Sequence, residues 1–332
     1  MGKEGNHLVA AGPLAAIAPV RDVLLPDERP LLIHTGYHKT GTTWMQQVLF
    51  RRRAGFHPLM THDDVFDRIT RSASLAFDPE PARRLIIERG AATPADAVNL
   101  ISSEILSGNP FYGGRDSRDF ADRLHRIAPR ARILITIREQ IAMAASIYMQ
   151  YLSRGGCLTK ESFFIETPAP GYFAFDPSHL EFHRLVGYYR MLFGPENVLV
   201  LTQESLRRDA RGFTDGIAAF SGNRTPISDR HLGQKAFGVS YPEYAAPVLR
   251  RMNHLRAGPV RPDSLINLGG FGENLYRATG WVARRPIVKA LFGGREPIRE
   301  FLGRLYADRF AESNRALAAF YPDLDLGGYQ GI

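Results

Sequence analysis

Short apolar runs alternate with amphipathic segments along the first two thirds of the chain. Four apolar runs have the length of a buried strand: residues 31–34, 98–105, 133–137 and a run that begins at Asn197. Segments with helical spacing follow them, the clearest at residues 118–128, 140–152, 178–193 and 204–220. Continuous apolar strands separated by helices are typical of a parallel sheet. The pattern therefore predicts an α/β protein.

The last third of the chain has a different pattern, in which helical segments are separated by glycine-rich breaks. We expect residues 231–244 and 265–276 to be loops near the mouth of a site. We expect one long helix over residues 296–321, with Pro322 as its stop. Residues 280–294 are basic and amphipathic, which fits either contact with a membrane or, as we favour, a packed helix with solvated charges.

The most informative stretch is residues 31–49, in which a strand leads through a glycine-containing turn into a helix. Gly36 and Gly41 allow the backbone to turn tightly and to approach a ligand closely. Lys39 adds a positive charge beside the unpaired N–H groups of the helix start. Hydroxyl donors come from Thr40, Thr42 and Thr43. Together these groups predict a pocket for a phosphate-like anion.

The spacing of the two glycines matches that of the nucleotide P-loop, but the position of the lysine does not. Thr42 stands where the P-loop lysine would be, and Lys39 lies inside the loop instead. The unbroken hexapeptide Lys39-Thr40-Gly41-Thr42-Thr43-Trp44 resembles the 5′-phosphosulfate loop of sulfotransferases. That family transfers a sulfuryl group from 3′-phosphoadenosine-5′-phosphosulfate (PAPS) to a hydroxyl or amine. The resemblance implies that residues 36–44 bind the donor.

A second motif follows the strand at residues 133–137. Arg138 leaves this strand, and Ser146 lies eight residues further on, about two turns inside the next helix. An arginine fork and a serine hydroxyl suit phosphate oxygens. The pair resembles the sulfotransferase motif that holds the donor's 3′-phosphate, although Gln140 replaces a proline that is frequent in the family.

Three residues are candidates for the general base. Glu104 lies at the carboxyl end of the strand predicted over residues 98–105, at the sheet edge where α/β proteins bind ligands. In sulfotransferases this strand tip faces the transferred group, so Glu104 is the first candidate; its alternative role is to cap a turn or to pair with an arginine. His38 and His62 are the other candidates, because histidines titrate nearer neutrality. The neighbours of His62, including Asp63 and Asp64, could line an acceptor site or cap a helix.

The resemblance covers roughly residues 30–222 and implies a three-layer α/β sandwich around a central parallel sheet, P-loop-like, with additional helices in the C-terminal third. We expect residues 1–28 to be a flexible leader and residues 29–332 to form one domain, with its core at 30–222 and a helical, loop-rich part at 223–332. Lys235, Arg256 and Arg261 are candidates to fold over the donor.

Composition and charge restrict the partners. The net charge of +8 and the pI near 9.7 favour an anionic ligand or a membrane surface, whereas no nucleic-acid motif is present. The single cysteine, Cys157, fits a reducing compartment, and with no span or clear signal we expect a cytoplasmic protein. The acceptor stays open between polysaccharide, lipid and small molecule, and so does the oligomeric state.

Two other functions remain as alternatives to sulfuryl transfer. A P-loop kinase would need an aspartate after an apolar strand to hold magnesium, and the three best strands end in Thr35, Glu104 and Arg138 instead. No metal is therefore implied. A non-catalytic nucleotide- or anion-binding protein could also keep the loop.

Overall fold

The computed structural model describes residues 31–166, 175–233, 241–262 and 266–332. The predicted leader and Lys235 lie outside the described residues. None of the helices in these ranges has both the length and the apolar character needed to cross a membrane.

Five parallel strands form one sheet with the order β2-β3-β1-β4-β5. The strands are β1 (Leu31–His34), β2 (Phe56–Pro58), β3 (Val98–Ser102), β4 (Arg132–Ile137) and β5 (Val198–Thr202). The apolar runs predicted four of them. They missed β2, a three-residue edge strand with a polar histidine and a proline, which exists because Phe56 pairs with Val98. The strand expected to reach residue 105 ends at Ser102, and Glu104 begins the short helical turn η6 (Glu104–Ser107).

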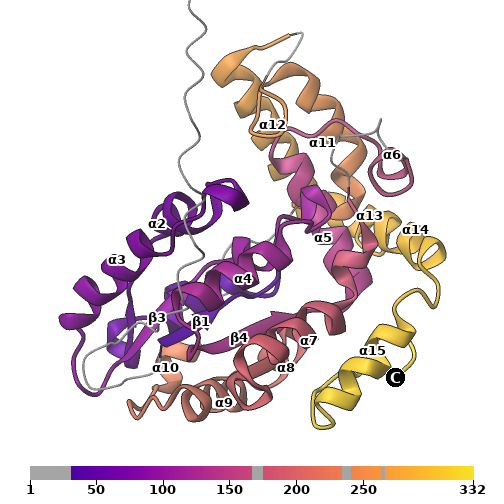
Figure 1. Cartoon of the computed structure of the whole chain (residues 1–332). Coiled ribbons are helices and arrows are strands. Elements are labelled where there is room, and N and C mark those ends of the chain that lie inside the picture. Colours follow the sequence, from indigo (N-terminus) through magenta and orange to yellow (C-terminus); the bar gives the residue numbers. More distant parts are fainter. Residues whose placement is uncertain (1–30, 167–174, 234–240, 263–265) are drawn as a thin grey trace, which may run out of the picture.

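Two apolar cores lie on opposite faces of the sheet, because successive side chains of a strand point in opposite directions. Ile33, Ile133 and Ile135 belong to one core, together with residues of four helices: α3 (Glu80–Ala91), α4 (Ser117–Ile127), α5 (Gln140–Ser153) and α7 (Phe182–Phe193). Leu32 and Leu134 belong to the other, together with the helix at residues 42–49 and α9 (Ala210–Ser221). The predicted sandwich of three layers is thereby confirmed (Figure 1).

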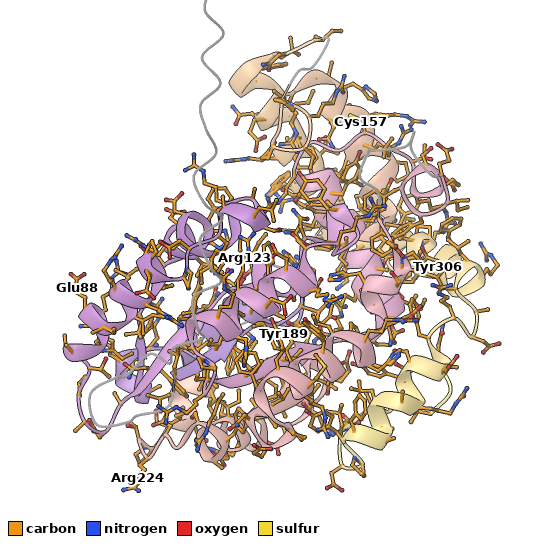
Figure 2. The ribbon with its side chains drawn as sticks, viewed as in Figure 1. Glu88, Arg123, Cys157, Tyr189, Arg224 and Tyr306 are labelled. Atoms are coloured by element: carbon orange, nitrogen blue, oxygen red, sulfur yellow. The ribbon has the colours of Figure 1, made fainter. Side chains whose placement is uncertain are left out.

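The helices connect the strands and then continue beyond the sheet. Their bounds are α1 (Thr42–Trp44), which continues as the wider turns of η2 (Met45–Leu49), α2 (His62–Val65), α3 (Glu80–Ala91), α4 (Ser117–Ile127), α5 (Gln140–Ser153), α6 (Lys160–Phe164), α7 (Phe182–Phe193), α8 (Gln203–Arg208), α9 (Ala210–Ser221), α10 (Asp229–Leu232), α11 (Ala246–Met252), α12 (Gly269–Ala283), α13 (Pro286–Phe292), α14 (Pro297–Leu305) and α15 (Ala311–Phe320). In Figure 2, Tyr189 of α7 lies in the interior, whereas Glu88 and Arg224 lie at the periphery.

Two expectations for the C-terminal third are wrong. The single helix predicted over residues 296–321 is two helices, α14 and α15, and Asp308 between them has φ of 58°. The loop predicted at residues 265–276 becomes α12 from Gly269 onward. Two glycines inside α12 mark close packing rather than a break: a Cβ on Gly272 would lie 2.3 Å from the carbonyl oxygen of Leu255, and one on Gly280 would lie 2.1 Å from the ring of Tyr241.

Candidate active site

The loop after β1 is held against β4 before it turns. The amide of Thr35 donates to the Leu134 carbonyl at 2.9 Å, and the amide of Tyr37 donates to the Thr136 carbonyl at 2.9 Å. Lys39 then adopts φ of 69°, a left-handed conformation that costs a non-glycine residue about 1–2 kcal/mol. Strain of this kind is concentrated at functional sites. The left-handed conformation places Lys39 at the end of the turn, just before the helix begins at Thr42.

A buried chain of polar side chains supports this loop from below. The ring of His34 bridges Ser102 on β3 (Nδ1 to Oγ, 2.9 Å) and Thr136 on β4 (Nε2 to Oγ1, 3.1 Å). The hydroxyl of Thr136 lies 2.8 Å from that of Thr40, which donates to the carbonyl of Tyr37 at 2.7 Å. Burial lowers the pKa of His34 to about 3, so the ring is neutral at physiological pH. Three strands are thus tied to the loop, a connection that the sequence did not indicate.

The same contacts explain Gly36 and Thr40. A Cβ on Gly36 would lie 2.1 Å from the Thr136 hydroxyl and 2.4 Å from His34 Nε2, so only glycine fits. The Thr40 hydroxyl is fully buried in the polar chain. Both residues were predicted to contact the donor; in this geometry the absence of a side chain at Gly36 and the hydroxyl of Thr40 shape the loop.

Arg138 and Ser146 meet as their spacing predicts. Arg138 follows β4 and is 6% exposed, and its Nη1 donates to Ser146 Oγ on α5 at 2.8 Å. The carboxylate of Glu139 caps α5 by accepting from the amides of Ile141 and Ala142 at 2.8 and 2.7 Å. Gln140, in place of the family's proline, is buried and donates to Asn314 of α15. The Nε of Arg138 is buried without a hydrogen-bond partner, so the guanidinium retains an unused donor.

Lys39 and Arg138 place two positive charges close together in the site. Burial, followed by the charges of Arg207 and Arg299, lowers the pKa of Arg138 to about 10 despite nearby carboxylates. Burial and the charge of Arg138 likewise lower the pKa of Lys39, against the opposing influence of Glu104. Among the described residues, neither Lys39 nor Arg138 forms an ion pair. Charges held together in this way are stabilised by an anionic ligand.

Both halves of the predicted donor site open into one cavity of about 610 Å³. Its lining includes the predicted residues His38, Lys39, Gly41, Thr42, Thr43, Trp44, Glu104, Arg138 and Ser146. Gly36, Thr40 and His62 are not part of the lining. The cavity has the size usual for cofactor sites.

The three candidate bases differ in their surroundings. Glu104 lines the cavity near Lys39. His38 also lines it, is 9% exposed, and has a buried Nδ1 without a hydrogen-bond partner. Burial is the main cause that lowers the pKa of His38, followed by the neighbouring His179, Arg154 and Lys39; the pKa falls to about 3, well below the neutral range expected from sequence. His62 is exposed, and its Nδ1 lies 3.3 Å from Ser103 Oγ.

The structure also separates the loop residues near His62 from the site. Thr61 caps α2, with the amide of Asp64 donating to its hydroxyl and Asp64 accepting from the amide of Thr61. Asp64 also pairs with Arg89 at 2.7 Å. The capping interpretation is therefore the one that the structure supports for Asp64.

Sequence reasoning missed two arginines of the cavity, Arg207 and Arg299. Arg207 follows β5 at the ligand-binding edge of the sheet, which was a usable signal. Arg299 lies on α14, and no signal in the sequence pointed to it. The arginines proposed instead are outside the lining: Arg256 is buried and donates to the Ser153 carbonyl at 2.7 Å, and Arg261 donates to the sulfur of Cys157 at 3.0 Å.

Comparison with models of known protein families identifies the family of this chain. The model of the family described as "Sulfotransferase domain" matches residues 29–232. A comparison with curated protein sequences gave no match. Among solved structures, the chain is similar to a sulfotransferase from Alicyclobacillus acidocaldarius, at 20% identity with a TM-score of 0.46, over 75% of this chain and 99% of that one.

Two further solved structures are more distant. The sulfotransferase domain of the Synechococcus PCC 7002 olefin synthase is 15% identical with a TM-score of 0.35, over 80% of this chain and 100% of that one. A mouse sulfotransferase complexed with PAP is 14% identical with a TM-score of 0.34, over 90% of this chain and 86% of that one. Because the family model covers more than half of the chain, the protein belongs to the sulfotransferase family.

Proposed function

We propose that this protein transfers a sulfuryl group from PAPS to a hydroxyl or amine acceptor. The observation that carries the proposal is the meeting of Lys39 with the Arg138–Ser146 pair in one cavity, where within the described part of the chain neither Lys39 nor Arg138 forms an ion pair. The mouse relative was solved with PAP, the product of such a donor.

The donor's two anionic groups fit the two halves of the cavity. The 5′-phosphosulfate would lie at Lys39, Thr42 and Thr43, where the helix start adds unpaired amides. The 3′-phosphate would lie at Arg138 and Ser146, where the unpartnered Nε supplies a further donor. Binding of these anions would relieve the mutual repulsion of Lys39 and Arg138.

In the proposed step, the acceptor oxygen or nitrogen forms a bond to sulfur while the bond from sulfur to the bridging phosphate oxygen breaks. Lys39 stabilises the negative charge that develops on the departing phosphate, and its fixed position makes this stabilisation available without reorganisation. The acceptor's proton passes to Glu104, our first candidate, which shares the cavity with Lys39. His38 is the alternative: it is neutral in the unliganded chain, and a bound anion would raise its pKa.

The C-terminal third belongs, in this proposal, to the same domain as the sheet. Ile298 and Leu302 of α14 and Leu317 of α15 are buried in the core that also contains Ile33 and Ile133.

The class of acceptor is open to direct measurement. Mass spectrometry of a panel of polysaccharides, lipids and small alcohols or phenols would identify it.

Calorimetry and label transfer test the proposal together. We expect adenosine 3′,5′-bisphosphate to bind equally well with and without EDTA, and radiolabelled sulfate to pass from PAPS to an acceptor in the panel. ATP binding that requires magnesium would instead support a kinase. Tight bisphosphate binding with no transfer to any acceptor would support a non-catalytic binding protein. To assign the base, Glu104→Gln is compared with His38→Ala and His62→Ala.

A further inference from the structure

Helices α12 and α13 carry a group of exposed apolar side chains, which we call the α12–α13 surface. They are Trp281, Val282, Ile287, Leu291 and Phe292, with exposed fractions of 57%, 49%, 76%, 68% and 41%. None of the seven residues of α13 is buried. Our preferred sequence interpretation, a packed helix, is therefore wrong for α13. Exposed apolar side chains of this size, gathered on two consecutive helices, mark a site of interaction.

The same surface is basic. Residues 274–295 include five arginines and lysines and no aspartate or glutamate. The guanidinium of Arg285 lies 3.3 Å from the ring centroid of Trp281, and that of Arg295 lies 5.4 Å from the ring centroid of Phe292. Within the described ranges of the chain, Arg285, Lys289 and Arg295 form no ion pair. Positive charges thus border the apolar side chains directly.

We propose that the α12–α13 surface docks the protein onto an anionic phospholipid bilayer. Ile287 and Leu291, four residues apart and so on one side of α13, would enter the acyl region. Trp281 would lie at the interface, where its ring can contact both lipid tails and headgroups. Arg285 and Lys289 would contact the anionic headgroups.

The charge of this surface favours a bilayer over a second copy of the chain. Two copies joined through it would bring their basic residues together without a compensating carboxylate, whereas anionic headgroups would neutralise them. The most exposed apolar side chains, Ile287 and Leu291, also protrude, which suits insertion between lipids.

The surface adjoins the cavity. Arg284 lies over the ring of Tyr241, a cavity residue, at 4.5 Å. The docking proposal does not depend on sulfuryl transfer, since it rests on surface residues alone. If both proposals hold, the cavity rim lies close to membrane-borne molecules.

Binding to vesicles tests the proposal on the full chain. Sedimentation with vesicles of equal parts phosphatidylcholine and phosphatidylglycerol is compared with sedimentation with phosphatidylcholine alone. The chain has two tryptophans, of which Trp44 is 8% and Trp281 57% exposed, so a blue shift on adding vesicles reports Trp281. We expect binding and a blue shift only with the anionic vesicles, both weakened by salt.

Paired substitutions separate the charge from the apolar contribution. Arg285→Gln with Lys289→Gln should weaken binding about 30-fold, at about fivefold for each basic residue. Ile287→Ser with Leu291→Ser should weaken it by about tenfold or more. Because all four side chains are exposed, the variants should keep the wild-type unfolding temperature.

Matched controls come from other segments of the chain, outside α12 and α13. Leu75→Ser with Met191→Ser removes apolar side chains that are 105% and 68% exposed, and Arg52→Gln with Arg53→Gln removes two exposed charges. Both controls should bind vesicles as the wild type does. The proposal is overturned if the wild type does not bind anionic vesicles, or if the controls lose binding equally. It is also overturned if the chain dimerises without lipid and Ile287→Ser with Leu291→Ser abolishes only that association, which would assign the surface to a second copy.

Discussion

Replacing Arg138 with methionine should separate donor binding from the stability of the fold. Methionine keeps an apolar stem in the space of the arginine and removes the charge and the donors. In the unliganded protein, burial and the charges of Arg207 and Arg299 lower the pKa of Arg138 from 12.5 to about 10. This shift corresponds to a cost of the order of 3 kcal/mol for keeping the guanidinium charged in the folded chain.

The substitution also removes the hydrogen bond from Arg138 to Ser146, which contributes about 1 kcal/mol. Because the relieved charge outweighs the lost bond, the unliganded variant should unfold at the wild-type temperature or above it. Its affinity for adenosine 3′,5′-bisphosphate should fall by about 1.5–3 kcal/mol, or about 10- to 150-fold. Its preference for this ligand over adenosine 5′-monophosphate should disappear.

Calorimetry with both nucleotides and thermal unfolding without ligand measure these effects. Arg132→Met is the matched control, because Arg132 lies at the other end of β4 and donates to the Phe220 carbonyl at 2.6 Å. That control should lose stability and keep the preference for the 3′-phosphate. A variant of Arg138 that still discriminates between the two nucleotides would refute its assignment to the 3′-phosphate.

Four further predictions follow from the site. Lys39→Ala should lower kcat more than it raises the donor's Kd, because the negative charge that Lys39 stabilises on the departing phosphate grows during transfer. If single-turnover kinetics showed a change in Kd alone, Lys39 would only position the donor. Glu104→Gln should reduce kcat by roughly 10²–10⁴-fold and leave donor affinity unchanged. If this variant kept near-wild-type turnover, the general base would be a histidine instead. Gly36→Ala should lower the free energy of unfolding in urea by about 1–3 kcal/mol, because the added Cβ would lie 2.1 Å from the Thr136 hydroxyl. The control Gly216→Ala should not destabilise the fold, because a Cβ there would have no atom within 4 Å. His34 has a folded-state pKa of about 3, against 6.5 in a free chain, so its neutral form stabilises the fold above pH 6.5. This stability is lost as the pH falls from 6.5 towards 3, by up to about 1.4 kcal/mol per pH unit, and a urea midpoint that stays constant across that range would contradict a buried neutral ring.

Local signals were enough to find the donor motifs. The hexapeptide at residues 39–44 and the Arg138–Ser146 pair are short segments whose geometry is fixed by a strand, a turn and a helix that are adjacent in sequence. The four longer strands were predictable for the same reason, because buried parallel strands are apolar throughout. The family and its α/β architecture could therefore be inferred without coordinates.

The tertiary structure decided what depends on residues far apart in the sequence. Ser102, His34 and Thr136 come from three strands, and only the sheet order brings their side chains into one polar chain under the loop. Arg299 reaches the cavity because α14 packs against α5, a contact with no local sequence signal.

The same distinction holds for helix ends and for burial. Gly272 belongs to a segment whose composition indicated a loop, yet it lies inside α12, where the absence of a side chain allows close contact with Leu255. The sequence by itself determined the family and pointed to the groups proposed to bind an anion, because these signals are local. Which groups share one cavity, and which apolar side chains remain exposed on α13, was decided by packing, since burial depends on the neighbours that the fold supplies.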